Sequence, residues 1–111
     1  MIGIDVVSVE RIDLNNKRFI EMVLTEEERQ ELAVYTADSR RKEYIAGRFA
    51  AKEAIFKATQ DRNYLNYAIL HEPSGRPYVK DHPEIDVSIS HDGGIAAAIV
   101  QIHTNRVGGS D

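Results

Sequence analysis

The stretch SRRKEYIAGRFAAKEAIFKAT, residues 39–59, decides the fold of this chain. It contains an apolar stripe, Ile45, Phe49 and Phe56, whose offsets place the three side chains on one side of an α-helix. A stripe of this kind is typical of a helix that packs one face against a core. The sequence therefore predicts one long helix here, with the stripe turned inward.

Shorter elements are expected on both sides of the long helix. Before it, residues 1–9 alternate well enough for a strand, and a helical segment is expected over 11–23. Thr25 and Glu28 have the spacing of a capping box, which predicts a second helix to about residue 34. After the long helix, strand signals separated by turn residues cover 66–71, 77–80, 85–90 and 95–103. One strand, then helices, then antiparallel strands predict an α+β fold with helices packed on one face of a sheet.

The last predicted strand, 95–103, is apolar on both faces. One face carries Ile95, Ala97 and Ile99, and the other carries Ala96, Ala98, Val100 and Ile102. A small sheet has few ways to bury both faces, so either helices or another subunit must cover them. We favour an oligomer.

Length and composition exclude several classes of protein. The 111 residues predict a single domain over 1–111, with 106–111 as a loose tail. No cysteine is present, which excludes disulfides, thiolate metal sites and a cysteine nucleophile. The longest apolar run, 95–100, is far shorter than the roughly 20 residues that cross a bilayer. The N-terminus MIGID shows no signal peptide, so we expect a soluble cytoplasmic protein without membrane contact.

Charge is distributed unevenly along the chain, whose formal net charge is −4. Residues 38–62 hold seven basic and four acidic side chains, a local charge of +3, whereas the rest of the chain carries −7. This segment either attracts an acidic protein or another polyanion, or is an ordinary solvated helix face. We expect no nucleic-acid partner, because the cluster Arg40, Arg41 and Lys42 lies in an acidic chain without interleaved exposed aromatic side chains.

Three charged residues of the long helix do not fit simple packing. At about 100° per residue, Lys52 falls near the centre of the apolar stripe, and Glu53 falls on its flank with Lys57 one turn further on. A charge on a core-facing stripe is unfavourable by several kcal/mol unless it is paired or bound. Either Lys52 extends along the stripe to water and Glu53 pairs with Lys57 on the surface, or these charges belong to a site. Periodicity alone favours the first interpretation.

Two other places stand out in the predicted strands. Asp5 interrupts the apolar first strand, two residues after Gly3. It is either an outward-facing strand residue or a carboxylate held on a rigid element for a hard cation such as Mg²⁺. Ser90 and His91 end a strand with one face lined by hydroxyl groups, just before the turn at Asp92. This end of the strand either contacts phosphate or is the solvent side of a hairpin.

Five segments together resemble the small stand-alone 4′-phosphopantetheinyl transferases, the holo-acyl-carrier-protein synthases. They are GIDVV at 3–7 with ERI at 10–12, LTEEE at 24–28, GRFAAKEAIFKA at 47–58, GRPY at 75–78 and VSISH at 87–91. The resemblance covers nearly the whole chain, in the right order. Its specific part is a phenylalanine, a Lys-Glu pair and a lysine at helical spacing, with Asp5 upstream and Ser-His downstream. It implies a 4′-phosphopantetheinyl transferase-like fold.

The resemblance implies a reaction and a metal. Members of the family transfer 4′-phosphopantetheine from coenzyme A to a serine of apo acyl carrier protein and release adenosine 3′,5′-bisphosphate. Mg²⁺ is expected on Asp5 and Glu53 together with the coenzyme A pyrophosphate. Lys57 matches a catalytic lysine that orients the pyrophosphate or assists proton transfer. The general base stays open between Glu53, Lys57 and a water molecule.

The resemblance also assigns contacts to both substrates. Positions that match family contacts to coenzyme A are Arg48, Lys52, Lys57, Ser90 and His91. Positions expected at the surface that binds an acidic acyl carrier protein are Arg11, Arg40 and Arg41. Small members of the family form trimers with sites between subunits, so we expect a homotrimer.

Two segments depart from the family pattern. A glycine-containing loop usually follows the catalytic lysine, whereas residues 58–62 contain no glycine, which predicts weaker coenzyme A binding. The family histidine is usually followed by a hydroxyl residue, whereas His91 is followed by Asp92, which repels phosphate unless it turns away. These departures support one alternative function: a catalytically silent homologue that binds acyl carrier protein through its basic helix.

Overall fold

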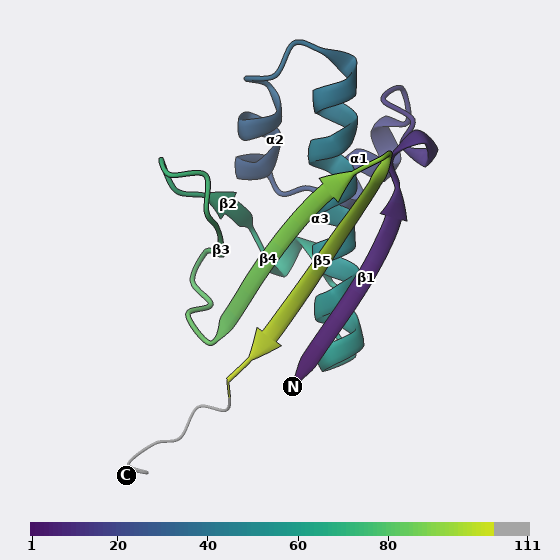
Figure 1. Ribbon diagram of the computed structural model, residues 1–111. Coiled ribbons are helices and arrows are strands. Elements are labelled where there is room, and N and C mark those ends of the chain that lie inside the picture. The colour runs from purple at the N-terminus through teal and green to yellow at the C-terminus, as the bar shows by residue number, and fades with distance from the viewer. Residues whose placement is uncertain (104–111) are drawn as a thin grey trace, which may run out of the picture.

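The computed structural model describes residues 1–103, and its elements follow the predicted order (Figure 1). They are β1 (Ile2–Ser8), the 3₁₀ turn η1 (Val9–Arg11), α1 (Lys17–Val23), α2 (Glu26–Leu32), α3 (Asp38–Thr59), the 3₁₀ turn η2 (Tyr64–Asn66), β2 (Ile69–His71), β3 (Pro77–Val79), β4 (Ile85–Asp92) and β5 (Ile95–Ile102). The tail predicted at 106–111 lies outside the described residues. Within 1–103, no helix is long and apolar enough to cross a membrane.

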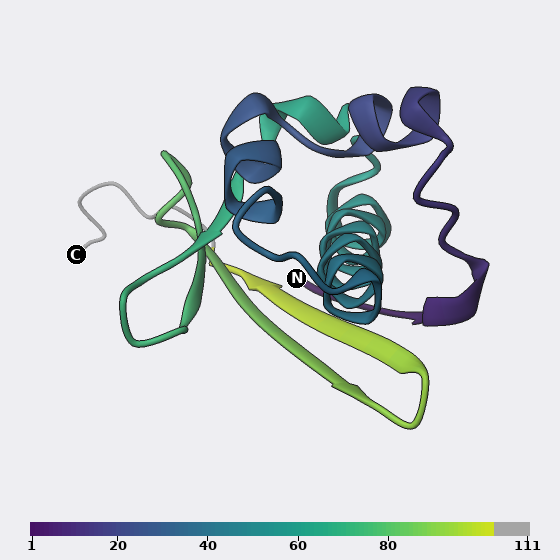
Figure 2. The same ribbon diagram turned by 90° about the horizontal axis from the view of Figure 1, so that it is seen from above.

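The strands form two antiparallel sheets. The larger has the order β1-β5-β4, so the first and last strands are neighbours, and the smaller is the β2-β3 hairpin. At the edge of the larger sheet, the Met1 amino group donates to the Ile102 carbonyl oxygen at 3.0 Å. The α-helices lie on one side of this sheet, with α3 directly against it (Figure 2). The predicted α+β fold with helices on one sheet face is confirmed.

Alternation along β1 sends its side chains into two environments. Ile2, Ile4 and Val6 point away from the helices and are more than half exposed. Gly3 and Asp5 lie on the opposite face, toward α3, where Gly3 is buried and Asp5 is partly buried. The interpretation of Asp5 as an outward-facing strand residue is therefore wrong.

Small residues bring α3 close to the sheet. Several alanines of α3 are fully buried, among them Ala54. A Cβ atom on Gly3 would lie 1.9 Å from the Ala54 carbonyl oxygen, so only glycine permits this approach of β1 to α3. Of the predicted stripe, Ile45 is fully buried, but Phe49 and Phe56 are partly exposed. The inward side of α3 is built mainly from alanine because the strand backbone leaves no room for larger side chains.

The segment before α1 is not helical, contrary to the prediction for 11–23. After η1 the chain is extended at Ile12 and then turns at residues 14–15, and α1 begins only at Lys17. The Asp13 carboxylate accepts a hydrogen bond from the backbone N–H two residues on, and the Asn16 side chain accepts from Phe19 N at 3.1 Å. These side chains satisfy backbone donors locally, which favours a turn followed by a helix cap over one continuous helix.

The start of α2 is as predicted. Thr25 Oγ1 accepts from Glu28 N at 3.2 Å, and Glu28 Oε1 accepts from Thr25 N at 2.7 Å, which are the two hydrogen bonds of a capping box. The bounds of the strands differ most from the prediction at β2 and β4, and by one residue at an end elsewhere. The strand expected over 66–71 is shortened to β2, since η2 takes its first residue, and β4 runs past residue 90 to Asp92.

We expect Gly3→Ala to destabilise the fold by about 3 kcal/mol or more, because the added methyl group meets a backbone oxygen of α3. Urea unfolding followed by circular dichroism measures this loss. Gly47→Ala is the matched control, since its Cβ would meet only the Ile89 Cγ2 atom, at 3.0 Å. The control should lose less than about 1 kcal/mol, because alanine also favours the helix. Equal losses in the two variants would contradict the role assigned to Gly3.

Candidate active site

The contact of β1 with α3 brings two carboxylates to one place. Gly3 touches Ala54, and the next helix-facing residue of the strand is Asp5, while Glu53 directly precedes Ala54. The Asp5 and Glu53 side chains are only 18% and 19% exposed. Both line the same pocket, of about 420 Å³. The structure thus joins the two carboxylates that the sequence predicted as metal ligands.

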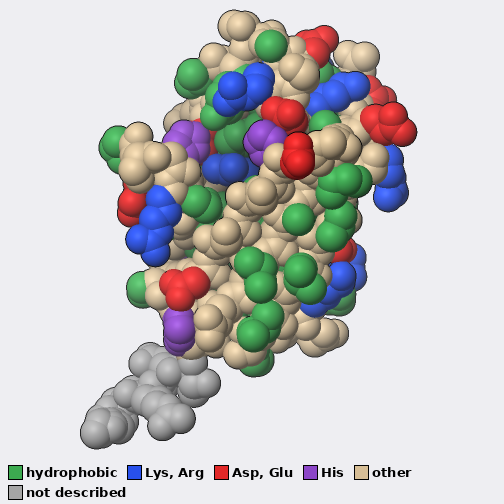
Figure 3. Space-filling model, viewed as in Figure 1, with side chains coloured by type: hydrophobic (Ala, Val, Ile, Leu, Met, Phe, Trp, Pro, Cys, Tyr) green, Lys and Arg blue, Asp and Glu red, His purple; other side chains and the backbone are tan. Residues whose placement is uncertain are grey.

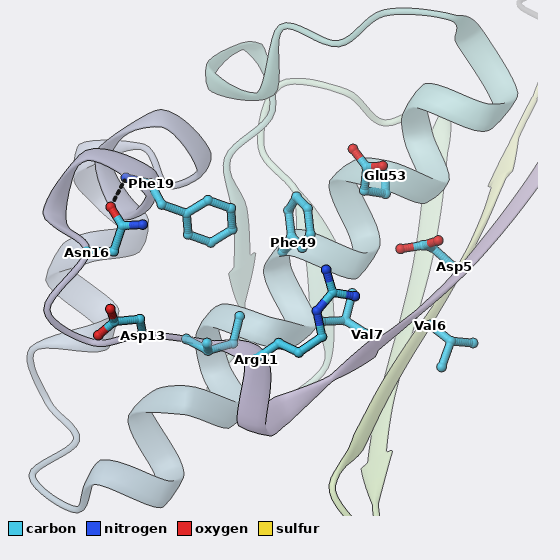
Figure 4. A pocket seen from close by; sticks show the side chains of 10 residues that line it. Asp5, Val6, Val7, Arg11, Asp13, Asn16, Phe19, Phe49 and Glu53 are labelled. Carbon is cyan, nitrogen blue, oxygen red and sulfur yellow. Dashed lines mark hydrogen bonds between the residues drawn. The ribbon is translucent and has the colours of Figure 1, made fainter.

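The pocket runs from these carboxylates along α3 toward α1 (Figure 4). Asp5 and Glu53 lie at one end, the Phe49 ring lies in the middle, and Asn16 and Phe19 lie at the other end. The Phe19 and Phe49 rings meet edge to face with 5.1 Å between their centroids. The pocket therefore has an acidic end and a middle lined by the Phe49 ring and the Arg11 guanidinium group, an arrangement that suits an elongated ligand with charged and apolar parts.

Lys57 pairs with Asp5, and its expected surface pair with Glu53 is not among the ion pairs of residues 1–103. Its Nζ lies 3.0 Å from Asp5 Oδ1 and 3.0 Å from the Ile4 carbonyl oxygen. The Lys57 side chain is 52% exposed. Its ammonium group is therefore accessible beside Asp5 while it neutralises that carboxylate.

Glu53 is held by two residues that the sequence reasoning missed. The Tyr64 hydroxyl donates to Glu53 Oε2, and an Arg62 guanidinium nitrogen lies 3.5 Å from the same oxygen. Arg62 also stacks over the Phe56 ring, 3.7 Å from its centroid. Burial, reinforced by the hydrogen bond to Glu53, raises the pKa of Tyr64 to about 12, so its hydroxyl keeps the proton that it donates. No motif marks either residue.

The two carboxylates keep oxygen atoms available for a cation. Within residues 1–103, Asp5 Oδ2 and Glu53 Oε1 accept no hydrogen bond, although both side chains are largely buried. Because both side chains line the pocket, a group outside the chain can reach and satisfy these oxygens. Mg²⁺ typically takes one or two carboxylates and completes its shell with water and phosphate, so this donor set fits Mg²⁺. In the same part of the chain, no group of three or more His, Asp or Glu side chains could hold a metal by itself.

Lys52 faces neither the pocket nor solvent. Its side chain is fully buried, and Nζ donates to Glu28 Oε1 at 2.6 Å. The carbonyl oxygens of Val23 and Tyr64 accept from the same ammonium group at 2.7 and 3.0 Å. The predicted contact of Lys52 with coenzyme A is therefore wrong, and so is the alternative in which it reaches water, because all three donors are used in the core. Burial lowers the pKa of Lys52, and the nearby Glu28 carboxylate opposes this shift.

Arg48 and His91 line a second pocket, of about 90 Å³, between α3 and β4. Arg48 is almost fully buried, with Nε donating to the Ile69 carbonyl oxygen at 3.0 Å and a terminal nitrogen 3.3 Å from Glu31 Oε1. His91 is more exposed, and its Nδ1 lies 3.7 Å from Glu43 Oε2. The structure brings these two predicted coenzyme A residues together, and much of the Arg48 guanidinium is engaged in contacts within the chain.

Ser90 lies on the other face of the sheet from His91. Strand alternation places Ser90 beside Ala97, on the face that α3 does not cover. Within one subunit, the geometry therefore gives no support to the predicted contact of Ser90 with a ligand of His91. The same alternation turns Asp92 away from Arg48, so the expected repulsion between Asp92 and a phosphate in that pocket does not arise.

The three arginines predicted to bind a carrier protein have different surroundings. Arg11 lines the pocket that holds Asp5, and its guanidinium group points into the middle of that pocket (Figure 4). Arg40 is exposed on α3. Arg41 donates to two backbone carbonyl oxygens at the end of α2, at 3.2 and 3.1 Å. Arg41 therefore joins α3 to α2, whereas Arg11 and Arg40 are available to a partner.

The loop after α3 has a backbone conformation that usually needs glycine. Gln60 ends the helix with φ of 68°, in the left-handed region. Its N–H still donates to the Phe56 carbonyl oxygen at 2.6 Å. Gln60 thus adopts the backbone conformation that a glycine would adopt at the end of α3, although residues 58–62 contain no glycine.

Comparison with known proteins identifies the family. Residues 1–100 match the family model described as the 4′-phosphopantetheinyl transferase superfamily. The chain belongs to this superfamily. The holo-[acyl-carrier-protein] synthase of Acholeplasma laidlawii is 36% identical to it over 112 residues, which cover 93% of this chain and 95% of that protein. The synthase of Listeria welshimeri is 41% identical over 113 residues, covering 91% of this chain and 95% of that protein.

Solved structures of phosphopantetheinyl transferases share the fold. The holo-(acyl-carrier-protein) synthase of Bacillus anthracis, in complex with CoA (3′,5′-ADP), has a TM-score of 0.82 at 33% identity, covering 94% of this chain and 96% of that one. The Helicobacter pylori synthase in complex with coenzyme A has a TM-score of 0.73 at 33% identity, covering 92% and 99%. The family and the enzyme class predicted from the sequence are confirmed.

Lys52→Met should destabilise this transferase by about 3–5 kcal/mol, because it leaves the Glu28 carboxylate buried without its cation. The double variant with Glu28→Gln should be more stable than Lys52→Met alone, since the unpaired charge is gone. Chemical denaturation of the four proteins completes a double-mutant cycle. Lys80→Met, which breaks the exposed pair with Glu27, is the control and should lose much less. A similar loss in Lys80→Met and Lys52→Met would contradict the buried pair.

Proposed function

We propose that this phosphopantetheinyl transferase modifies a serine of an acidic acyl carrier protein, with coenzyme A as donor and Mg²⁺ as metal. The serine oxygen forms a bond to the phosphorus of the phosphopantetheine. The P–O bond within the coenzyme A pyrophosphate breaks, and adenosine 3′,5′-bisphosphate leaves. The observation that carries the proposal is the meeting of Asp5 and Glu53 where β1 touches α3. The names of the relatives and the coenzyme A complexes among the similar structures support it.

Asp5 and Glu53 would hold the metal through the oxygen atoms that accept no hydrogen bond in residues 1–103. Mg²⁺ bound there with the pyrophosphate would neutralise the charge that develops during phosphoryl transfer. The chain contributes rigidity. One carboxylate stands on a strand and the other on a helix, and each has its second oxygen held by a donor. Little reorganisation is then needed when the substrates arrive.

Lys57 is proposed as the third catalytic residue. Its ammonium group is held at Asp5 and is also accessible, so it can orient the pyrophosphate at the metal site. The serine proton would go to Glu53, to a water molecule, or to Lys57 once its ammonium group has lost a proton. Both stand on the same face of α3, one turn apart, which keeps the charge-bearing groups of the reaction on one rigid element.

Substrate contacts follow from the two pockets. We assign the phosphorylated nucleotide end of coenzyme A to the pocket of Arg48 and His91. Arg11 and Arg40 are the arginines proposed to contact the acidic carrier protein, since their guanidinium groups are accessible. The position of Arg11 in the pocket of Asp5 would bring the carrier serine close to the metal site.

The uncovered face of the sheet supports a homotrimer. Ile2, Ile4, Val6, Ile95 and Ile99 are between 42% and 65% exposed. Ile4 stands opposite Ile99 in the ladder, and hydrophobic side chains gather over β1 and β5 on the face away from the helices (Figure 3). A contiguous apolar surface of this kind marks an interaction site. We propose that three copies of the chain bury it, as the resemblance to the small trimeric transferases implies.

Asp5→Asn and Glu53→Gln should each lower the transfer rate at least about 100-fold, because each removes a charge proposed to bind the metal and keeps the side-chain shape. The assay incubates an apo acyl carrier protein with the enzyme, coenzyme A and MgCl₂. Intact-mass spectrometry then follows the gain of one phosphopantetheine with time. An excess of chelator should stop the wild-type reaction.

Glu26→Gln is the control for the carboxylate variants, since Glu26 is an exposed carboxylate of α2 outside both pockets. It should transfer at the wild-type rate. Normal transfer by Asp5→Asn or Glu53→Gln would contradict the proposed site. No transfer by the folded wild-type protein with several carriers would instead favour the catalytically silent homologue that binds a carrier through its basic helix.

Ile4→Asp should convert the trimer to a monomer, because it places a charge in the middle of the apolar sheet face. Size-exclusion chromatography with light scattering gives the mass directly. Val34→Asp is the control, since Val34 is 77% exposed after α2 and outside the sheet, and it should leave the mass unchanged. A wild-type protein with the mass of one chain would contradict the trimer.

A further inference from the structure

Tyr64 is held at three points beside the candidate site. Its carbonyl oxygen accepts from the buried Lys52 ammonium at 3.0 Å. Its ring meets the Phe49 ring edge to face, with 6.1 Å between centroids. Its hydroxyl donates to Glu53 Oε2. With backbone, ring and hydroxyl all fixed, Tyr64 presents its donor at one place only.

This donor selects the orientation of Glu53. A glutamate side chain has three torsions and can place its carboxylate in several positions, so one fixed donor decides among them. Oε2 accepts from Tyr64, whereas Oε1 accepts no hydrogen bond within residues 1–103 and stays available to a cation. Arg62 is the weaker constraint, because its side chain is 57% exposed and lies 3.5 Å from Oε2.

We propose that Tyr64 is a positioning residue that orients Glu53 for Mg²⁺. The inference rests on the proposed function and adds a residue outside the five quoted sequence segments, 3–7 with 10–12, 24–28, 47–58, 75–78 and 87–91. Tyr64→Phe keeps the ring against Phe49 and the carbonyl on Lys52, so the fold persists while Glu53 loses its fixed donor. The expected result is weaker metal binding, with the maximal transfer rate largely retained when Mg²⁺ is saturating.

The experiment compares Tyr64→Phe with Tyr67→Phe. Tyr67 is the matched control, because its hydroxyl also donates to a carboxylate, Asp61 Oδ2 at 2.6 Å, in the same part of the chain. Mn²⁺ is titrated into each protein with coenzyme A at a fixed concentration, and free Mn²⁺ is measured by electron paramagnetic resonance. The Mn²⁺ dissociation constant should rise about tenfold in Tyr64→Phe and stay within about twofold of wild type in Tyr67→Phe.

A transfer assay provides the second readout. The Mg²⁺ concentration that gives half the maximal rate should rise in Tyr64→Phe by the same factor as the Mn²⁺ dissociation constant. Far-ultraviolet circular dichroism should be the same for both variants. An unchanged Mn²⁺ affinity in Tyr64→Phe, or a wild-type protein that binds no Mn²⁺, would overturn the inference.

Failure of the proposed function gives a different pattern of results. In that case the wild-type protein modifies no carrier, yet its Mn²⁺ binding still depends on the Tyr64 hydroxyl. Conversely, a wild-type enzyme that transfers phosphopantetheine while Tyr64→Phe binds Mn²⁺ normally supports the function and overturns only the role of Tyr64.

Discussion

A single buried ammonium group joins the small elements of this fold. Lys52 of α3 bonds to the end of α1 at Val23, to α2 at Glu28 and to η2 at Tyr64. Glu28 extends the junction to β2, because its second oxygen accepts from Ile69 N at 2.8 Å. Helices of seven residues, the length of α1 and α2, are marginal by themselves and depend on tertiary contacts. The charge pair supplies such a contact and specifies which ends must meet.

Consecutive residues of α3 have different roles, one in the core and the next in the candidate site. Lys52 and Glu53 are consecutive, and a rotation of about 100° sends the first into the core and the second into the pocket. Lys57 follows Glu53 by one turn and meets Asp5 across the contact of β1 with α3. A run of charges can therefore lie on a helix that packs closely against a sheet, since each charge has its own partner and its own side. The alanines between them allow the close packing that fixes those sides.

The predictable part of this protein was the part governed by local spacing. The capping box at Thr25, the extent of α3 and the two-faced apolar strand β5 all follow from periodicity and turn residues. The pairing of Lys52 with Glu28 could not be predicted from the sequence. The two residues are distant in the chain, and the capping box already explained the presence of Glu28. The inward side of α3 was misjudged because large side chains mark a stripe more visibly than close-packed alanine does. Tyr64 lies in a short turn without periodicity, so no pattern marks it. The cytoplasmic location stays a prediction.

The strand that carries Asp5 has one neighbour in its sheet, the last strand, with Ile2 beside Gln101 in the ladder. During synthesis Asp5 is made long before the strand that pairs with it, because β1 forms its sheet hydrogen bonds with residues 95–102. Asp5 stands opposite Ala98 in that ladder, so most of residues 1–103 is made before this pairing can form. β1 is thus fixed in its sheet only after α3 has been made, so the position of Asp5 beside Glu53 is secured when β5 joins the strand.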